Sequence, residues 1–502
     1  MGTDVDRTEF SREDRAHFRA KVQSCMDALA RMLADGGFAT SGAQIGLEVE
    51  LNLVDAAMQP AMANAEVLLA IADPDFQTEL GQFNIEINVA PRPLAGDETL
   101  VLEQALRASL DAADARARDS GRHLVMIGML PALTREHFHH QWLSVSPRYD
   151  LLNQQIFAAR GEDLELDITG VLLPGAERAE RLVITSDSIL PEAACTSVQL
   201  HLQVQPEAFA AHWNAAQCLT GVQVALAGNS PFLAGTALWH ESRVPVFEQA
   251  TDTRPLELKN QGVRPRVWFG ERWITSVFDL FEENSRYFPA LLPVCSDEDP
   301  LAALGAGRTP ELSELKMHNG TVYRWNRPIY DTVDGTPHLR VENRVLPAGP
   351  TVLDTLANAA FYYGALRALV DADRPVWTQM SFDAAEENLH SGARDGFDAQ
   401  LYWPEVGWVR PDELVLRRLL PMAHEGLRSH GVSDEARVRY LGVIEGRCLA
   451  RRTGSVWQRE TVAALEAEGA DRSAALTEML RRYTELMHGN TPVHTWPVVA
   501  PG

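Results

Sequence analysis

The strongest constraint on the fold is an alternation of apolar and polar residues that occurs in four separate runs of the chain. The runs are IGLEVELNLVD (45–55), FNIEINV (83–89), SVQLHLQV (197–204) and LRVENRV (339–345). Successive side chains of a β-strand point to opposite faces, so each run predicts a strand with one apolar and one polar face. Such strands are typical of an antiparallel sheet that buries one face under helices.

The polar positions of the four runs carry carboxylates, amides, a histidine and arginines. They include Glu48, Glu50, Asn84, Glu86, Asn88, Gln199, His201, Arg340, Glu342 and Arg344. Neighbouring strands lie about 4.8 Å apart, so in one sheet the four glutamates crowd onto one surface. Carboxylates held that close either take up protons or bind cations, and Mg²⁺ favours oxygen ligands. For any single run, a solvated sheet face is the alternative interpretation.

The net charge excludes some classes of partner. With 45 basic and 69 acidic residues the chain carries a charge of −24, which argues against nucleic acid or an anionic membrane surface as the main partner. No Gly-Lys-Ser/Thr sequence is present, so a Walker phosphate loop is absent and any triphosphate would be held by arginine and metal.

Cysteine usage and the N-terminus bear on location. The five cysteines are scattered and form no C-x-x-C pair, and MGTDVDRTEF (1–10) lacks an apolar signal core. Both observations favour a reducing, cytoplasmic environment. The stretch 193–240 is poor in charge, but glycine, proline and polar residues interrupt it. We interpret it as a buried strand, helix and loop, not as a membrane span.

The remaining patterns predict an α+β fold: a largely antiparallel sheet with a concave polar face, helices on its other face and a helical C-terminal region. Helices are expected near 11–36, 97–120, 149–160, 207–227 and 351–370, a buried strand over 123–130, and three or four helices over 411–488. We expect residues 1–400 to form a catalytic domain and residues 401–502 a helical extension packed on it.

Three other features receive structural interpretations. The histidines of 137–140 are expected on an exposed loop, and Cys195 is interpreted as a core thiol because no base partner is recognisable. Trp268 and Trp273 are expected to pack in the protein interior, in preference to stacking on an adenine ring.

The order of the polar-faced runs resembles that of a known family. GLEVEL, FNIEINVAP, TSVQLHLQV, RWNRPIYD and VENRVLPAGPT follow one another as in the glutamate–cysteine ligase type 2, or carboxylate–amine ligase, family. The resemblance covers roughly residues 40–400 and includes AAEENLHSGARDGFDAQL. It implies a glutamine-synthetase-like catalytic sheet and an ATP-dependent ligase. Such ligases activate a carboxylate, typically the γ-carboxylate of glutamate, as an acyl phosphate, which an amine attacks to give an amide, ADP and phosphate.

The resemblance also implies roles for individual residues, with two or three Mg²⁺ ions on the polar face. The metal ligands would be Glu48, Glu50, Glu86, His201 and Glu342; the groups near the transferring phosphoryl would be Arg340 and Arg344; the ATP or substrate contacts would be Arg324, Arg327, Gln199, Asn84 and Asn88. Related ligases usually have histidine where this chain has Gln199, which puts one metal position in doubt.

Two other functions stay open at this point. One is a guanidino kinase, or a ligase for another amine, on the same fold. The other is a catalytically silent nucleotide or amino-acid sensor. The expected partners are small molecules: ATP, glutamate or a similar carboxylate, and an amine such as cysteine. The sequence identifies neither the amine nor the oligomeric state, so a homo-oligomer stays open.

Overall fold

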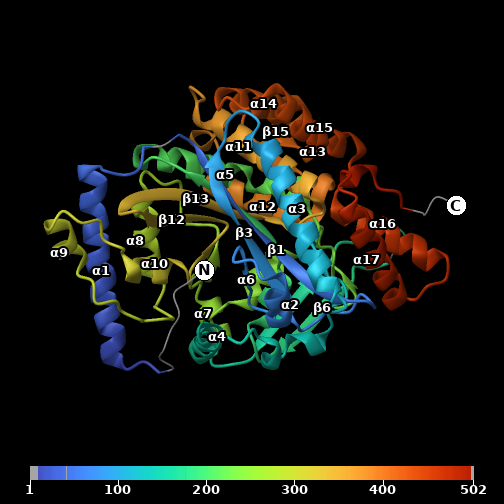
Figure 1. The fold of residues 1–502 in the computed structure, drawn as a ribbon, viewed down its shortest axis with the longest axis horizontal. Coiled ribbons are helices and arrows are strands. Elements are labelled where there is room, and N and C mark those ends of the chain that lie inside the picture. Colours follow the sequence, from blue (N-terminus) through green and yellow to red (C-terminus); the bar gives the residue numbers. More distant parts are fainter. Residues whose placement is uncertain (1–8, 41, 174, 176, 499–502) are drawn as a thin grey trace.

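The computed structural model describes residues 9–498 except residues 41, 174 and 176. At its centre lies one sheet in the order β12-β13-β7-β1-β3-β2, with β4 paired to the end of β1 (Figure 1). These strands are β1 (Gln44–Asp55), β2 (Phe76–Thr78), β3 (Asn84–Pro93), β4 (Arg122–Val125), β7 (Ser197–Gln203), β12 (Asn326–Val333) and β13 (Thr336–Pro347). Every pairing in the sheet is antiparallel. The predicted fold class is confirmed, and the four alternating runs are the adjacent strands β13, β7, β1 and β3.

The strand register brings the predicted polar residues opposite one another. Glu50 of β1 faces Glu86 of β3. On the other side of β1, Glu48 faces Gln199 of β7. Glu342 of β13 in turn faces His201. Because side chains alternate along each strand, this register collects the polar positions on one face of the sheet.

Helices cover the apolar face. Side chains such as Leu47, Ile85, Leu200 and Val341 form one hydrophobic core with α3 (Glu98–Arg118), α5 (Pro206–Ala227), α11 (Val352–Val370) and α12 (Phe382–Asp395). Most residues of α5 and α11 are buried. The charge-poor stretch 193–240 is thus a strand and an interior helix, as predicted. No helix within the described residues has the length and apolar character needed to cross a membrane.

The C-terminal helices join the same core. Helix α13 (Pro411–Leu414) runs through a π-helical turn (Val415–Leu419) into α14 (Leu420–Ser429), and α15 (Asp434–Ala450), α16 (Gly454–Ala467) and α17 (Arg472–His488) follow. Three or four helices were expected over this range, and α13 with α14 counts as one continuous helical segment beside α15, α16 and α17. Arg447 of α15 forms a buried 2.8 Å ion pair with Asp354 of α11. The boundary at residue 400 stays a prediction.

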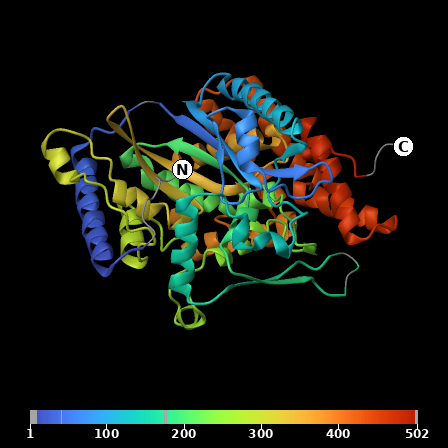
Figure 2. The ribbon, with the colours of Figure 1, turned by 60° about the horizontal axis from the view of Figure 1, so that its bottom comes forward.

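Shorter elements surround the sheet. In Figure 1, α1 (Arg12–Asp35), α8 (Val277–Tyr287), α9 (Pro300–Gly305) and α10 (Ser313–Asn319) lie beyond the β12–β13 edge. Figure 2 shows the separate hairpin of β5 (Leu164–Thr169) and β6 (Arg181–Ser186) extending away from the central sheet. The other elements are α2 (Asn64–Ile71), α4 (Pro147–Arg160), α6 (Arg243–Ala250), α7 (Leu256–Asn260), β8 (Phe232–Leu233), β9 (Thr236–Ala237), β10 (Val267–Trp268), β11 (Tyr323–Arg324), β14 (Leu401–Trp403) and β15 (Gly407–Val409).

One predicted strand is shorter than expected. In the run 123–130, only the residues up to Val125 pair with β1, because β4 ends there. At Gly128 the backbone approaches Asn229 and Pro347 so closely that a Cβ atom would lie 2.8 Å from Pro347 Cβ. The chain therefore leaves the sheet after Val125 to pass beside these residues. The prediction of location used the acidic N-terminus. Residues 1–8 of that segment lie outside the described residues.

Candidate active site

The polar face of the sheet forms the floor of a cleft of about 650 Å³. Most of the predicted site residues line this cleft: Glu48, Glu50, Asn84, Glu86, Gln199, Arg327, Arg340, Glu342 and Arg344. Four separate segments of sequence thus supply one concave surface because their strands are neighbours in the sheet.

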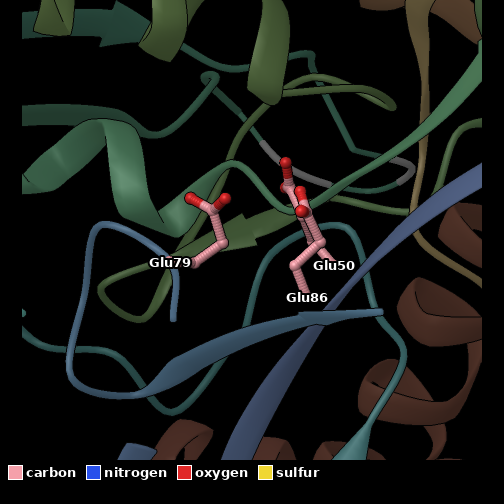
Figure 3. A group of neighbouring side chains, drawn as sticks. All are labelled: Glu50, Glu79 and Glu86. Atoms are coloured by element: carbon pink, nitrogen blue, oxygen red, sulfur yellow. The ribbon is translucent and has the colours of Figure 1, made fainter. Parts of the chain in front are cut away.

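Three carboxylates converge at the β1–β3 side of the cleft. One oxygen from each of Glu50, Glu79 and Glu86 lies within 4.8 Å of the others. Figure 3 shows the three side chains, which come from neighbouring backbone segments and reach toward the same region. Glu79 follows directly after β2, which pairs with β3 and so carries Glu79 to Glu86. Oxygen atoms at this spacing match the ligands that hard divalent cations prefer.

The protonation of these carboxylates reflects their crowding. Burial, followed by the charges of Glu48 and Glu50, raises the pKa of Glu86 to about 7. Burial and the charges of Glu86 and Glu50 raise the pKa of Glu79 well above its ordinary range. Burial also raises the pKa of Glu50, although Arg344 acts in the opposite direction. Part of this cluster therefore holds protons near neutral pH unless a cation replaces them.

A second group lies at the β7–β13 side of the same face. Nε2 of His201 lies 3.0 Å from Oε1 of Glu48, while Nδ1 of the same ring accepts a 3.2 Å hydrogen bond from Nε of Arg340. Burial acts to raise the pKa of Glu48, but the contact with His201 outweighs it and the pKa is lowered. Nε2 of His201 is buried and makes no well-aligned hydrogen bond among the described residues.

Two arginines hold the carboxylate of Glu342. Nη2 of Arg327 lies 2.9 Å from Oε1 of Glu342, and Nη1 of Arg344 lies 2.7 Å from the same oxygen. Burial opposes ionisation of Glu342, but the two guanidinium groups outweigh it and hold the pKa well below its ordinary range. Glu342 is therefore ionised throughout the physiological pH range, and it fixes both arginines at the edge of the cleft.

Gln199 links the two groups. Its Nε2 donates a 3.0 Å hydrogen bond to Oε1 of Glu50, and its Oε1 accepts a hydrogen bond from Nη1 of Arg344. The amide donates through its nitrogen and accepts through its oxygen. The departure from the usual histidine thus has a definite role here: Gln199 orients one carboxylate and one arginine.

The asparagines predicted to contact substrate support other side chains. Nδ2 of Asn88 donates a 2.8 Å hydrogen bond to Oε1 of Glu86, so Asn88 orients that carboxylate from outside the cleft lining. Nδ2 of Asn84 donates to Oδ1 of Asn52 at 3.1 Å. Asn84 does line the cleft, and its buried Oδ1 accepts no hydrogen bond among the described residues.

Arg324, like Asn88 and His201, does not line the cleft. It is 1% exposed, its Nη2 lies 2.9 Å from Oε2 of Glu283, and its guanidinium stacks 4.9 Å from the ring of Trp268. These partners place it in the protein interior behind the cleft wall. Trp268 and Trp273 are interior packing residues, as expected: Trp268 is buried and Trp273 packs edge-on against Phe382.

Several cleft residues were absent from the sequence-based prediction. They are Glu79, Arg148, Tyr149, Glu192, Arg243, Glu311 and Lys316. Glu79 follows a three-residue strand and Glu192 lies in a 3-10 turn, so neither belongs to an alternating run. The histidines of 137–140 do not line the cleft. Nδ1 of His139 lies 3.6 Å from Oδ1 of Asp187, and Nε2 of His140 lies 3.5 Å from Oδ1 of Asp150.

The residues of the cleft fit divalent metal ions. Glu50, Glu79 and Glu86 offer converging oxygens, and their raised pKa values arise partly from one another's charge. His201 and Glu48 offer a second nitrogen–oxygen pair, with Nε2 of the ring 3.0 Å from Oε1 of Glu48. A metal ion would relieve the repulsion in the first group and complete the coordination of the second.

Comparison with known proteins identifies a family. The model of the Glutamate-cysteine ligase family 2 (GCS2) matches residues 44–478, a range that contains the whole acidic face. No curated protein sequence matches the chain.

Among solved structures, a glutamate–cysteine ligase from Francisella tularensis in complex with AMP is 12% identical at a TM-score of 0.52, and the match covers 93% of this chain and 91% of that one. A bifunctional glutathione synthetase from Pasteurella multocida is 12% identical at a TM-score of 0.47, covering 93% of this chain and 55% of that longer one. At 12% identity the likeness to the first structure concerns the fold alone. The family model, by contrast, spans the chain from the first strand of the sheet to the last helix. The chain therefore belongs to glutamate-cysteine ligase family 2, and with it to the ATP-dependent ligases.

Proposed function

We propose that the protein joins the γ-carboxylate of glutamate to an amine and uses ATP and Mg²⁺ to do so. The γ-carboxylate attacks the terminal phosphorus of ATP to give an acyl phosphate and ADP. The amine then attacks the acyl carbon, the amide C–N bond forms and phosphate leaves. The observation that carries this proposal is the acidic face in a cleft whose described lining also includes five arginines.

Mg²⁺ would be held by Glu50, Glu79 and Glu86 in one group and by Glu48, His201 and Glu342 in the other. Bound there, Mg²⁺ would neutralise the charge on the phosphate oxygens. Phosphoryl transfer depends mainly on such charge neutralisation and on correct positioning of the reactants. The two groups of side chains on the face would provide ligands for two or three ions.

The arginines supply the remaining positive charge. Arg344 projects between Glu342 and Gln199, beside the first carboxylate group. Its planar guanidinium can bind phosphate oxygens in pairs, and the contacts with its two neighbours fix its orientation before substrate arrives. Arg327 and Arg340 line the same cleft and would bind the nucleotide or the transferring phosphoryl group.

A direct test incubates the protein with ATP, Mg²⁺, glutamate and single amines, and follows ADP release together with the mass of the product. We expect ADP only when glutamate is present, and a product whose mass equals glutamate plus amine minus water. ADP release with a guanidine and no glutamate would identify a kinase instead. Saturable ATP binding without turnover for any amine would identify a sensor.

A further inference from the structure

One carboxyl group of the cleft has no hydrogen-bond or ion-pair partner among the described residues. Glu192 lies in the 3-10 turn Leu190–Ala194, directly before β7, and lines the cleft. Among the described residues, its side chain makes no hydrogen bond or ion pair, and its Oε2 is buried. Burying a carboxyl group without a partner costs stability, and an unsatisfied buried polar group of this kind calls for an explanation such as a catalytic role or a missing ligand.

The other acids on the floor of the cleft differ from Glu192 in this respect. Both oxygens of Glu50 accept hydrogen bonds, from the Ser197 N–H at 2.6 Å and from Gln199. Glu342 is held by Arg327 and Arg344, and Glu48 contacts His201. The one guanidinium whose charge acts on Glu192, that of Arg344, is already bound to Glu342 and Gln199.

Glu192 lines the same cleft as Glu50 and Arg344. The charges that act on it are those of Arg344 on β13 and Glu50 on β1. In turn, its own charge acts on Tyr149 of α4, on Tyr323 of β11 and on the nearby Cys195. These three groups are neutral at physiological pH because burial raises the pKa of each above its ordinary value. Glu192 thus lines the cleft and interacts electrostatically with residues assigned to metal and phosphate.

We propose that Glu192 binds the ammonium group of the acceptor amine and removes a proton from it before attack on the acyl phosphate. This inference rests on the proposed function. The acceptor enters as R–NH₃⁺ and gives one proton to the Glu192 carboxylate. The free amine attacks the acyl carbon, the C–N bond forms and the C–O bond to phosphate breaks. The nitrogen loses its second proton to the departing phosphate, and Glu192 returns its proton to phosphate or solvent.

The electrostatics of Glu192 suit this role. Burial raises the pKa of Glu192 to about 8, although Arg344 acts to lower it. A general base is most effective when its pKa lies near the working pH, and such a base contributes roughly 10²- to 10⁴-fold to a rate. A carboxylate of ordinary pKa would accept a proton from an ammonium group far less readily.

Two small nucleophiles of similar size test the inference with the full-length protein. The ammonium ion must lose a proton before it can attack, whereas hydroxylamine is largely uncharged at neutral pH and attacks directly. The assay supplies ATP, Mg²⁺ and glutamate with either nucleophile, and measures glutamine or γ-glutamyl hydroxamate. In Glu192→Gln we expect glutamine formation to fall by about 100-fold or more, and hydroxamate formation to stay within about threefold of wild type. Glu192→Asp should recover part of the rate with ammonium.

The outcomes separate the two proposals. If the wild type forms no hydroxamate, the proposed ligase function itself is wrong. If the wild type forms hydroxamate but Glu192→Gln loses both activities equally, or neither, or if the wild type fails with ammonium, the role of Glu192 is wrong. Glu311→Gln is the matched control, since Glu311 lines the same cleft but already accepts from Thr332 at 2.7 Å and Lys316 at 3.0 Å. It should change both rates in the same proportion. Thermal unfolding of each variant checks that the fold is intact.

Discussion

Glu50 on β1 and Glu86 on β3 are directly opposed across two antiparallel strands. Like charges in this position destabilise a sheet, and Glu79 brings a third carboxylate within 4.8 Å. A strand pair with a purely structural role would gain stability from almost any other choice. The arrangement is explained if the protein holds cations there, because the ions convert the repulsion into a binding site.

Magnesium should therefore stabilise the fold through this cluster. We expect Mg²⁺ to raise the melting temperature of the wild type, with a gain of about 2.7 kcal/mol at a concentration 100-fold above the dissociation constant. Glu86→Gln should be more stable than wild type in EDTA, because a repulsive charge is removed, and should gain less from Mg²⁺. Differential scanning calorimetry with and without metal measures both effects.

The exposed Glu165 of β5 supplies the control for that experiment. Glu165→Gln should leave both the metal-free stability and the Mg²⁺ gain as in wild type. A Mg²⁺ gain in Glu86→Gln equal to that of wild type would place the cation elsewhere.

Glu86 should make a contribution to the stability of the metal-free protein that is lost as the pH rises. Burial and neighbouring charges raise the pKa of Glu86 from 4.5 to about 7, so the folded state binds more protons than the unfolded state between these values. By linkage, the free energy of unfolding then falls as the pH rises from about 4.5 to 7, by on the order of 3 kcal/mol for this group. Glu48 and Glu342, whose pKa values are lowered, act only at lower pH.

Urea unfolding in EDTA at a series of pH values between 5 and 8 measures this slope. Buried histidines with lowered pKa values, such as His240 and His318, act in the opposite direction below about pH 6.5, so the contribution of Glu86 is the difference between wild type and Glu86→Gln. The stability of wild type relative to Glu86→Gln should fall as the pH rises, and Mg²⁺ should reduce this difference by competing with protons for the carboxylates. Parallel pH profiles of the two proteins would contradict the assignment of the raised pKa.

The acidic face could be predicted from sequence because alternation in a strand fixes the side on which each residue lies. The prediction that four glutamates share this face needed only the assumption that their strands belong to one sheet. They are Glu48, Glu50, Glu86 and Glu342. Glu79 and Glu192 could not be found in this way, because a loop and a 3-10 turn have no fixed period and tertiary packing alone orients their side chains. Arg324 was misplaced for a related reason: β11 has two residues, too few for alternation to tell the cleft side from the interior.

Arg344→Lys should impair catalysis much more than stability. Lysine keeps the charge but cannot contact Glu342 and Gln199 while presenting a planar fork to phosphate. We expect kcat to fall by roughly 100-fold or more, the size of effect seen when one transition-state donor is removed. Steady-state kinetics of ADP release, with melting temperature as the control, measure this change. Near-normal turnover would discredit the assignment of Arg344 to the phosphoryl group.

Arg324 should show the opposite behaviour. Arg324→Gln leaves Glu283 buried without its 2.9 Å ion-pair partner, and loss of one member of a buried pair costs about 3–5 kcal/mol. We expect a large drop in the free energy of unfolding in urea. The KM for ATP, measured on the fraction of the variant that is folded, should stay within about twofold of the wild-type value. A rise in the KM for ATP with unchanged stability would instead indicate that Arg324 contacts the nucleotide.

The most direct test of the acidic face as a metal-dependent nucleotide site is a calorimetric titration with a non-hydrolysable ATP analogue. The titration is run in Mg²⁺ and in EDTA, on the wild type and on Glu50→Gln and Glu86→Gln. We predict tight binding by the wild type in Mg²⁺, at least tenfold weaker binding in EDTA, and a loss of most of this metal dependence in both variants. Equal affinity with and without Mg²⁺, or no binding by the wild type in either condition, would contradict the account.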